Sequence, residues 1–205
     1  MTETIVRPTV RDDATWLRLT RVGAAVAIVG IAIMCPTYLF WKTVDGGDFK
    51  YAADYWLTAA ALPLGSGLLL HTVGVHRLQH GRDGRLGAAG TWLFVACIVE
   101  LVVQCMASVV VGAELRWGPT YVLCAFGTFV GLALLAAGSW RAGLVPRWML
   151  GVWPPLGLLG AFFGVGPIPF VLAAFLVALE VVLGRRVEAA AVAPASAMSH
   201  HLVGE

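Results

Sequence analysis

The sequence predicts an all-α polytopic membrane protein, with six transmembrane helices in one bundle and both termini in the cytoplasm. Three observations lead to this fold class. The 205 residues are 59% hydrophobic and 13% charged, with a mean hydropathy of +0.82, whereas about 25% of the residues in a soluble domain are charged. Apolar runs long enough to cross a bilayer recur along the chain. Basic residues gather between alternate runs, as they do in cytoplasmic loops.

The first half of the chain supplies three predicted spans. Residues 1–21 are polar and form a predicted cytoplasmic arm, and the first span after it has no small-x-small cleavage site, so we expect it to be retained as a helix. A turn-forming Asp45-Gly-Gly-Asp48 precedes the second span, in which Pro63 favours a kink. An arginine-rich loop precedes the third. The predicted boundaries are Val22–Trp41, Ala53–Val75 and Leu86–Gly112.

The second half supplies three more spans. A short external turn leads into the fourth, the fifth is short and interrupted by Pro154-Pro155, and the sixth ends at Arg185-Arg186. These spans are predicted at Pro119–Ser139, Met149–Phe163 and Ile168–Leu183. The six-helix transmembrane domain therefore covers residues 22–186, and the alanine-rich residues 187–205 are predicted to be a disordered cytoplasmic tail.

The distribution of the basic residues predicts the orientation. Six spans with both termini inside place 11 of the 14 basic residues on the cytoplasmic side, and the reverse orientation would place them outside. We therefore predict an N-in, C-in protein of the bacterial plasma (inner) membrane. Tryptophans are predicted to form interfacial belts, with five near the inner boundary: Trp16, Trp92, Trp140, Trp148 and Trp153.

The last third of the chain resembles uncharacterised six-span membrane proteins of actinobacteria. The resemblance consists of the string Trp140-Arg-Ala-Gly-Leu-Val-Pro-Arg-Trp148, a glycine-rich span after it, and a Gly-Pro turn before a final apolar helix that ends in Arg-Arg. These are hydropathy and turn features. The resemblance therefore implies a fold and no particular activity.

Glu100 is the acidic residue predicted to lie deepest in the membrane. It is about 21 to 22 Å along the helix from Arg85 and from Glu114, and a charged carboxylate at the bilayer centre costs about 2.5–3.5 kcal/mol on insertion scales. Residues three or four apart share a helical face. The face of Glu100, with Cys97, Gln104 and Ser108, is predicted to point into the bundle. A second face is predicted to contact lipid and contains Phe94, Ile98, Val102, Cys105 and Val109.

Two interpretations of Glu100 and Gln104 stay open. The pair could carry a proton or bind a cation, because a desolvated carboxyl group can exchange protons near neutral pH. It could equally be a structural clasp, in which a protonated Glu100 bonds Gln104 and a neighbouring helix.

Three other ionisable groups are candidates for a site. Asp54 lies with Tyr55, Glu114 and Arg116 at the predicted outer mouth, where interfacial charge is the alternative explanation. His71 is a predicted protonatable partner for the central polar face, with simple hydrogen bonding near a helix end as the alternative. Glu180 is predicted to reach the inner interface and to be structural or accessory.

Several classes of site lack support in the sequence. His76 and His80 have metal-binding spacing but no third ligand nearby, so no metal site is predicted. The four cysteines are interpreted as buried thiols, with an oxidised pair of Cys35 and Cys124 as the alternative. No cofactor-binding or soluble-enzyme motif is present. The formal net charge of +2 is too small to suggest nucleic-acid binding.

Three function classes follow. The first is a small-molecule or proton-linked transport or binding module built around Glu100, because ionisable residues inside the membrane are functional hypotheses by default. The second is a structural or regulatory subunit that packs, as a homo-oligomer or hetero-oligomer, through Gly127/Gly131 or Gly160/Gly164. The third is a membrane enzyme acting on a lipid or isoprenoid, with Glu100 as general acid. The lipid bilayer is the partner common to all three.

Overall fold

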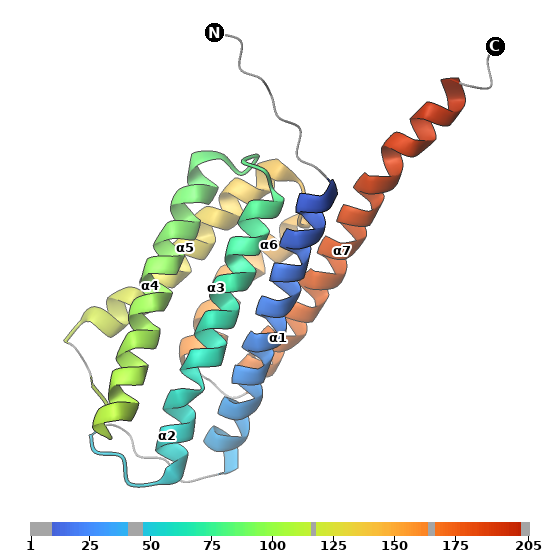
Figure 1. The fold of residues 1–205 in the computed structure, drawn as a ribbon. Helices are drawn as coiled ribbons and strands as arrows, with labels where there is room; N and C mark the ends of the chain where they lie inside the picture. Colours follow the sequence, from blue (N-terminus) through green and yellow to red (C-terminus); the bar gives the residue numbers. More distant parts are fainter. Residues whose placement is uncertain (1–9, 41–46, 116–117, 164–166, 202–205) are drawn as a thin grey trace.

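The described part of the chain is helical throughout apart from short connections. The computed structural model describes residues 10–40, 47–115, 118–163 and 167–201. The helices pack side by side, with the start of α1 and the end of α7 at the same end of the bundle (Figure 1). They are α1 (Val10–Phe40), α2 (Ala52–Ala59), α3 (Ala61–Leu78), α4 (Gly84–Val111), α5 (Thr120–Ala142), α6 (Arg147–Leu158), the π-helical turn η1 (Leu159–Phe163) and α7 (Ile168–His201).

Five helical segments in the described residues are long and apolar enough to cross a membrane. They are 22 to 28 residues long, and α2 and α3 together form one of them, Ala52–Leu78. The predicted fifth span corresponds to α6 and η1, which cover only residues 147–163, and its two prolines, Pro154 and Pro155, lie inside the continuous helix α6. The all-α class and the apolar multi-pass character are therefore confirmed. The count of six spans stays a prediction.

Glycines bring α1 and α3 into backbone contact. A methyl group added at Gly67 would lie 2.2 Å from the backbone nitrogen of Ala27, and one added at Gly30 would lie 2.5 Å from that of Leu64. Helices in lipid gain no hydrophobic free energy by associating, because lipid is as apolar as their side chains. Their association depends on close van der Waals packing, which these glycines permit.

Helix α4 packs against both α3 and α5, and this corrects the predicted lipid-facing side. Phe94 and Ile98, predicted to face lipid, are each only 1% exposed. The buried stripe of α4 is wider than one face because two helices cover it. The exposed positions are shifted around the helix and include Trp92, Val99 and Val103.

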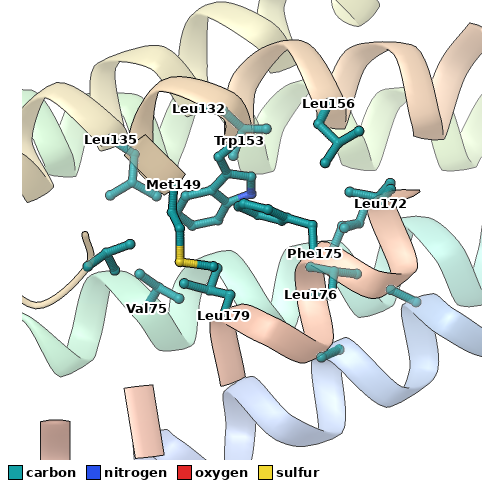
Figure 2. Packing of buried hydrophobic residues seen from close by; sticks show 14 of the residues in the cluster. Val75, Leu132, Leu135, Met149, Trp153, Leu156, Leu172, Phe175, Leu176 and Leu179 are labelled. Atoms are coloured by element: carbon teal, nitrogen blue, oxygen red, sulfur yellow. The ribbon is translucent and has the colours of Figure 1, made fainter. Parts of the chain in front are cut away.

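Trp153 lies at the centre of the packing between α5, α6 and α7. Its indole is surrounded by Met149, Leu132 and Phe175 in the hydrophobic cluster (Figure 2). It is 1% exposed, so its predicted place in an interfacial belt is wrong. The reason is that the faces of α5 and α7 converge on α6 at this position. Trp92, Trp140 and Trp148 are exposed, as an interfacial position requires.

The helix ends differ from the predicted segment boundaries. Helix α1 begins at Val10, inside the predicted arm 1–21. The guanidinium carbon of Arg77, on α3, lies over the ring of Trp16 at 5.6 Å from the ring centre. Helix α7 continues to His201, so most of the segment predicted as a disordered tail is helical. Alanine has the highest helix propensity, which favours this conformation. Arg116, predicted at the outer mouth, lies outside the described residues.

We expect Gly67→Ala to destabilise the protein by about 1–3 kcal/mol, because the new methyl group forces α1 and α3 apart. The measurement is the thermal unfolding midpoint of purified protein in a mild detergent. Gly151→Ala is the matched control, since nothing lies within 4 Å of a methyl group added there. Equal midpoints for the two variants would contradict the close packing of α1 on α3.

Candidate functional site

His71 and Glu180 form a buried pair inside the bundle. Nδ1 of His71 lies 3.0 Å from Oε1 of Glu180, and the two side chains are 0% and 12% exposed. His71 is on α3 and Glu180 on α7, so 109 residues separate them in the sequence. The ring of Trp153, from α6, meets the imidazole edge to face at a centroid distance of 5.8 Å. Three helices thus converge on this pair.

Thr20 of α1 completes the cluster. Its hydroxyl oxygen lies 3.0 Å from Oε2 of Glu180 and 2.9 Å from the carbonyl oxygen of Leu17, so its single proton is shared between two acceptors. The carbonyl oxygen of Thr20 lies 3.3 Å from Nδ1 of His71. This approach depends on Gly23, where an added methyl group would lie 2.4 Å from the backbone nitrogen of His71. The glycine packing of α1 on α3 therefore builds the site.

Two atoms of this cluster have no hydrogen-bond partner among the described residues: Nε2 of His71 and Oε1 of Glu180. Nδ1 of His71 is shared between the Thr20 carbonyl and Glu180, which leaves Oε1 without a well-aligned donor. Burying an unsatisfied polar group costs about 1–3 kcal/mol. Such groups usually bond water, an ion or a ligand, or exchange a proton.

An imidazole and a carboxyl group in contact can hold one proton between them in two neutral arrangements. One is imidazolium with carboxylate, and the other is imidazole with carboxylic acid. Both forms occupy the same two atoms, Nδ1 of His71 and Oε1 of Glu180. Adding or removing one proton leaves a net charge of one inside an apolar bundle, which is costly unless a counter-charge or water accompanies it.

Glu100 and Gln104 contact each other as predicted from their spacing. Nε2 of Gln104 donates to Oε1 of Glu100 at 3.1 Å. Gln104 is 1% exposed, with its Oε1 lacking a partner among the described residues, whereas Glu100 is only partly buried. This geometry fits both the proton-carrying pair and the structural clasp. The contacts of His71 are with Thr20, Glu180 and Trp153, none of which belongs to the Glu100 face.

The remaining predicted site residues contribute to local structure. Ser108 donates to the Gln104 carbonyl at 2.9 Å and accepts from the backbone nitrogen of Leu115 at 3.0 Å, which fixes the chain after α4. Cys97 is 9% exposed and packs at the α4–α5 interface, with its thiol against Gly127 of α5. All four cysteines are free.

Asp54 caps the start of α2. Its Oδ2 accepts hydrogen bonds from the backbone nitrogens of Lys50 and Tyr51, each at 2.9 Å, and the residue is 4% exposed. Carboxylates at this position stabilise a helix because the first backbone N–H groups lack helical partners. The contacts of Asp54 with α2 therefore favour a structural role at this end of the bundle.

A second polar cluster ties the α3–α4 turn to α1 and α5. His76 Nδ1 lies 2.5 Å from Oδ2 of Asp83, whose side chain is 0% exposed. Gln79 donates to Ser139 at 2.7 Å, and His80 bonds Asp13. His76 and His80 therefore each contact a carboxylate, Asp83 and Asp13 respectively. Among the described residues, no group of three or more His, Cys, Asp or Glu side chains is arranged to hold a metal ion.

The glycine face of α5 is used within the chain. A methyl group added at Gly131 would lie 2.7 Å from the backbone nitrogen of Phe94, and one at Gly127 would lie 2.4 Å from the thiol of Cys97. This face therefore packs on α4. Gly160 packs on Leu172 of α7. Oligomerisation stays a prediction, and Gly164 lies outside the described residues.

Comparison with protein-family models, with curated proteins and with solved structures gives no match to this chain. The fold itself defines its class: the described residues form an all-α bundle with five apolar helical segments suited to a multi-pass membrane environment.

We expect Thr20→Val to cost about 1–3 kcal/mol, because it keeps the shape of the side chain but removes the proton donor to Glu180. Thr20→Ser, which keeps the hydroxyl group, is the matched control. Thermal unfolding in detergent compares the two. A valine variant as stable as the serine variant would show that this hydrogen bond contributes nothing.

Proposed function

We propose that this protein is a proton-linked transport or binding module of the bacterial plasma membrane, and that His71 and Glu180 carry its exchangeable proton. The observation that carries the proposal is the buried pair itself, with its 3.0 Å separation between Nδ1 of His71 and Oε1 of Glu180. Ionisable groups within membrane helices are rare, usually face protein or water, and commonly mark proton relays or ion paths. A structural role for the pair also leaves Nε2 of His71 without a hydrogen-bond partner among the described residues.

The proposal moves the centre of the site from Glu100 to Glu180. Glu180 of α7 contacts two other helices, α1 through Thr20 and α3 through His71, whereas the hydrogen bond of Glu100 is to Gln104 of its own helix. A proton that binds between helices changes the contacts between them, so it can be coupled to a rearrangement of the bundle. A proton that binds between two residues of the same helix changes the contacts between helices less.

Irregular helix geometry at two positions supports a transport mechanism. Helices α2 and α3 meet at Ala60, which keeps a right-handed helical conformation, and α6 contains Pro154 and Pro155 and is followed by the π-helical η1. Proline and π-helical turns favour bends in a helix, and such bends can act as the hinge points that alternating access requires.

The proposed topology has six spans with both termini in the cytoplasm. Helix α6 and η1 together extend about 25 Å at 1.5 Å per residue, slightly less than the bilayer core of about 30 Å, a mismatch that local thinning accommodates. An even number of crossings agrees with the start of α1 and the end of α7 lying at one end (Figure 1). The ends of α3 and α5 and the starts of α4 and α6 carry basic residues, as cytoplasmic loops do: Arg77, Arg82, Arg85, Arg141 and Arg147.

Proton flux tests the functional proposal, with the proton as the probe because the substrate is unidentified. Purified protein is reconstituted into vesicles that contain a pH-sensitive dye, and a potassium diffusion potential drives proton entry. We expect measurable entry with wild type and entry at the level of protein-free vesicles with Glu180→Gln. Glu188→Gln, an exposed residue of the same helix, is the control.

Two outcomes would overturn the assignment to Glu180. Equal flux for wild type and Glu180→Gln would remove the proposed role of the carboxyl group. Loss of flux in Glu100→Gln, with Glu180→Gln unaffected, would return the site to the α4 face.

The six-span topology is tested by labelling with a membrane-impermeant maleimide. In a background with the four native cysteines replaced, we expect Arg141→Cys to react only from the cytoplasmic side and Pro167→Cys only from the external side. Both positions are exposed and lie on either side of α6 and η1. Labelling of both cysteines from the same side would show that α6 and η1 do not cross the membrane.

A further inference from the structure

A hollow of about 410 Å³ lies between α5 and α6. Its wall on α5 runs from Phe129 to Trp140, and its wall on α6 includes Gly151 and the Pro154-Pro155 pair. These lining side chains are apolar except for the indole N–H of Trp140. Along α5 the hollow extends about 16 Å at 1.5 Å per residue. That length is about half of the 30 Å hydrocarbon core, or one leaflet.

The shape of the hollow fits a single hydrocarbon chain. Small residues, Ala133, Ala137 and Gly151, are among those that line it, and the larger Phe129 and Trp140 are its first and last lining residues along α5. At Gly151 a methyl group would meet nothing within 4 Å, so the space is open there. A helix about 10 Å in diameter is too wide for a hollow of this volume along 16 Å. A flexible acyl chain is narrow enough to fit.

Positive charge lies at one end of the hollow. The guanidinium carbon of Arg147 lies 5.0 Å from the ring centre of Trp140, which lines the hollow and is 52% exposed. Arg141 follows Trp140 in the last turn of α5 and is also exposed. Within the described part of the chain, neither arginine is joined to an acidic side chain. Guanidinium groups bind phosphate through paired hydrogen bonds.

We propose that the α5–α6 hollow is a binding site for one anionic phospholipid. One acyl chain occupies the hollow, and the phosphate group binds Arg147 and Arg141 at the membrane surface. Tryptophan and arginine side chains occupy this level of a bilayer by preference, which matches the depth at which a phosphate group lies. The site is separate from the His71–Glu180 pair and does not depend on its proposed function.

The test is native mass spectrometry of the full-length protein, taken from micelles that contain equimolar phosphatidylglycerol and phosphatidylcholine with identical acyl chains. We expect wild type to retain one lipid, with phosphatidylglycerol preferred by about fivefold for each arginine that contributes. Arg147→Gln should reduce the preference by about fivefold and leave the number of bound lipids unchanged.

Gly151→Leu should fill the hollow and abolish lipid retention, whereas Val152→Leu, at the neighbouring exposed position, should retain the lipid as wild type does. If Gly151→Leu lowers the unfolding midpoint, Ala137→Leu fills the hollow from the opposite wall and replaces it. Unchanged lipid retention in the filled variants would overturn the proposal, and so would equal retention of the two lipids by wild type. A dimer that disappears in the filled variants would instead identify a second copy of the chain as the occupant.

Discussion

The close packing of α1 on α3 is the constraint on which the rest of the structure depends. In lipid, helices associate through van der Waals contact and interhelical hydrogen bonds, because no hydrophobic gain is available. Gly23, Gly30 and Gly67 permit backbone contact along most of the two helices. The same contact brings the carbonyl of Thr20 to the imidazole of His71. A single packing solution thus provides both the framework of the bundle and two walls of its polar site.

The apolar core and the polar site meet at Trp153. Its indole fills the space between α5, α6 and α7 (Figure 2) and also presents an edge to His71. Movement of α6 at Pro154-Pro155 would therefore change the surroundings of the imidazole directly. In the proposed function, this connection is the physical route between a proton on His71 or Glu180 and the position of α6.

Hydropathy and turn residues were enough to predict the helical class and the apolar central part of the long helices, because a chain in lipid must satisfy its backbone hydrogen bonds internally. The spacing of Glu100 and Gln104 correctly predicted their contact, since residues four apart on a helix are neighbours. The buried side of α4 was predicted only in part. Periodicity places residues on a face but does not reveal how many helices cover it, and Phe94 and Ile98 are buried by the additional contact.

Sequence periodicity could not predict the contact between His71 and Glu180. The two residues are 109 positions apart, and their contact depends on the way in which α7 packs against α1. One signal was present in the sequence: Glu180 is an acidic residue within an apolar helix, as Glu100 is, and its closeness to Arg185 gave it an interfacial interpretation. Asp54 is the opposite case, because its place at the start of α2 was visible in the sequence and agrees with its capping role.

The most direct measurement of the central claim is the protonation state of His71 in a lipid bilayer. Solid-state nitrogen NMR of protein labelled at its five histidines, with the His71 signals identified by their loss in His71→Gln, reports the proton on each ring nitrogen. The proposed exchange predicts that the Nδ1 and Nε2 signals of His71 change between pH 5 and pH 9, and that Glu180→Gln alters this change. A ring that keeps one neutral form over the whole range, with or without Glu180, would contradict the account.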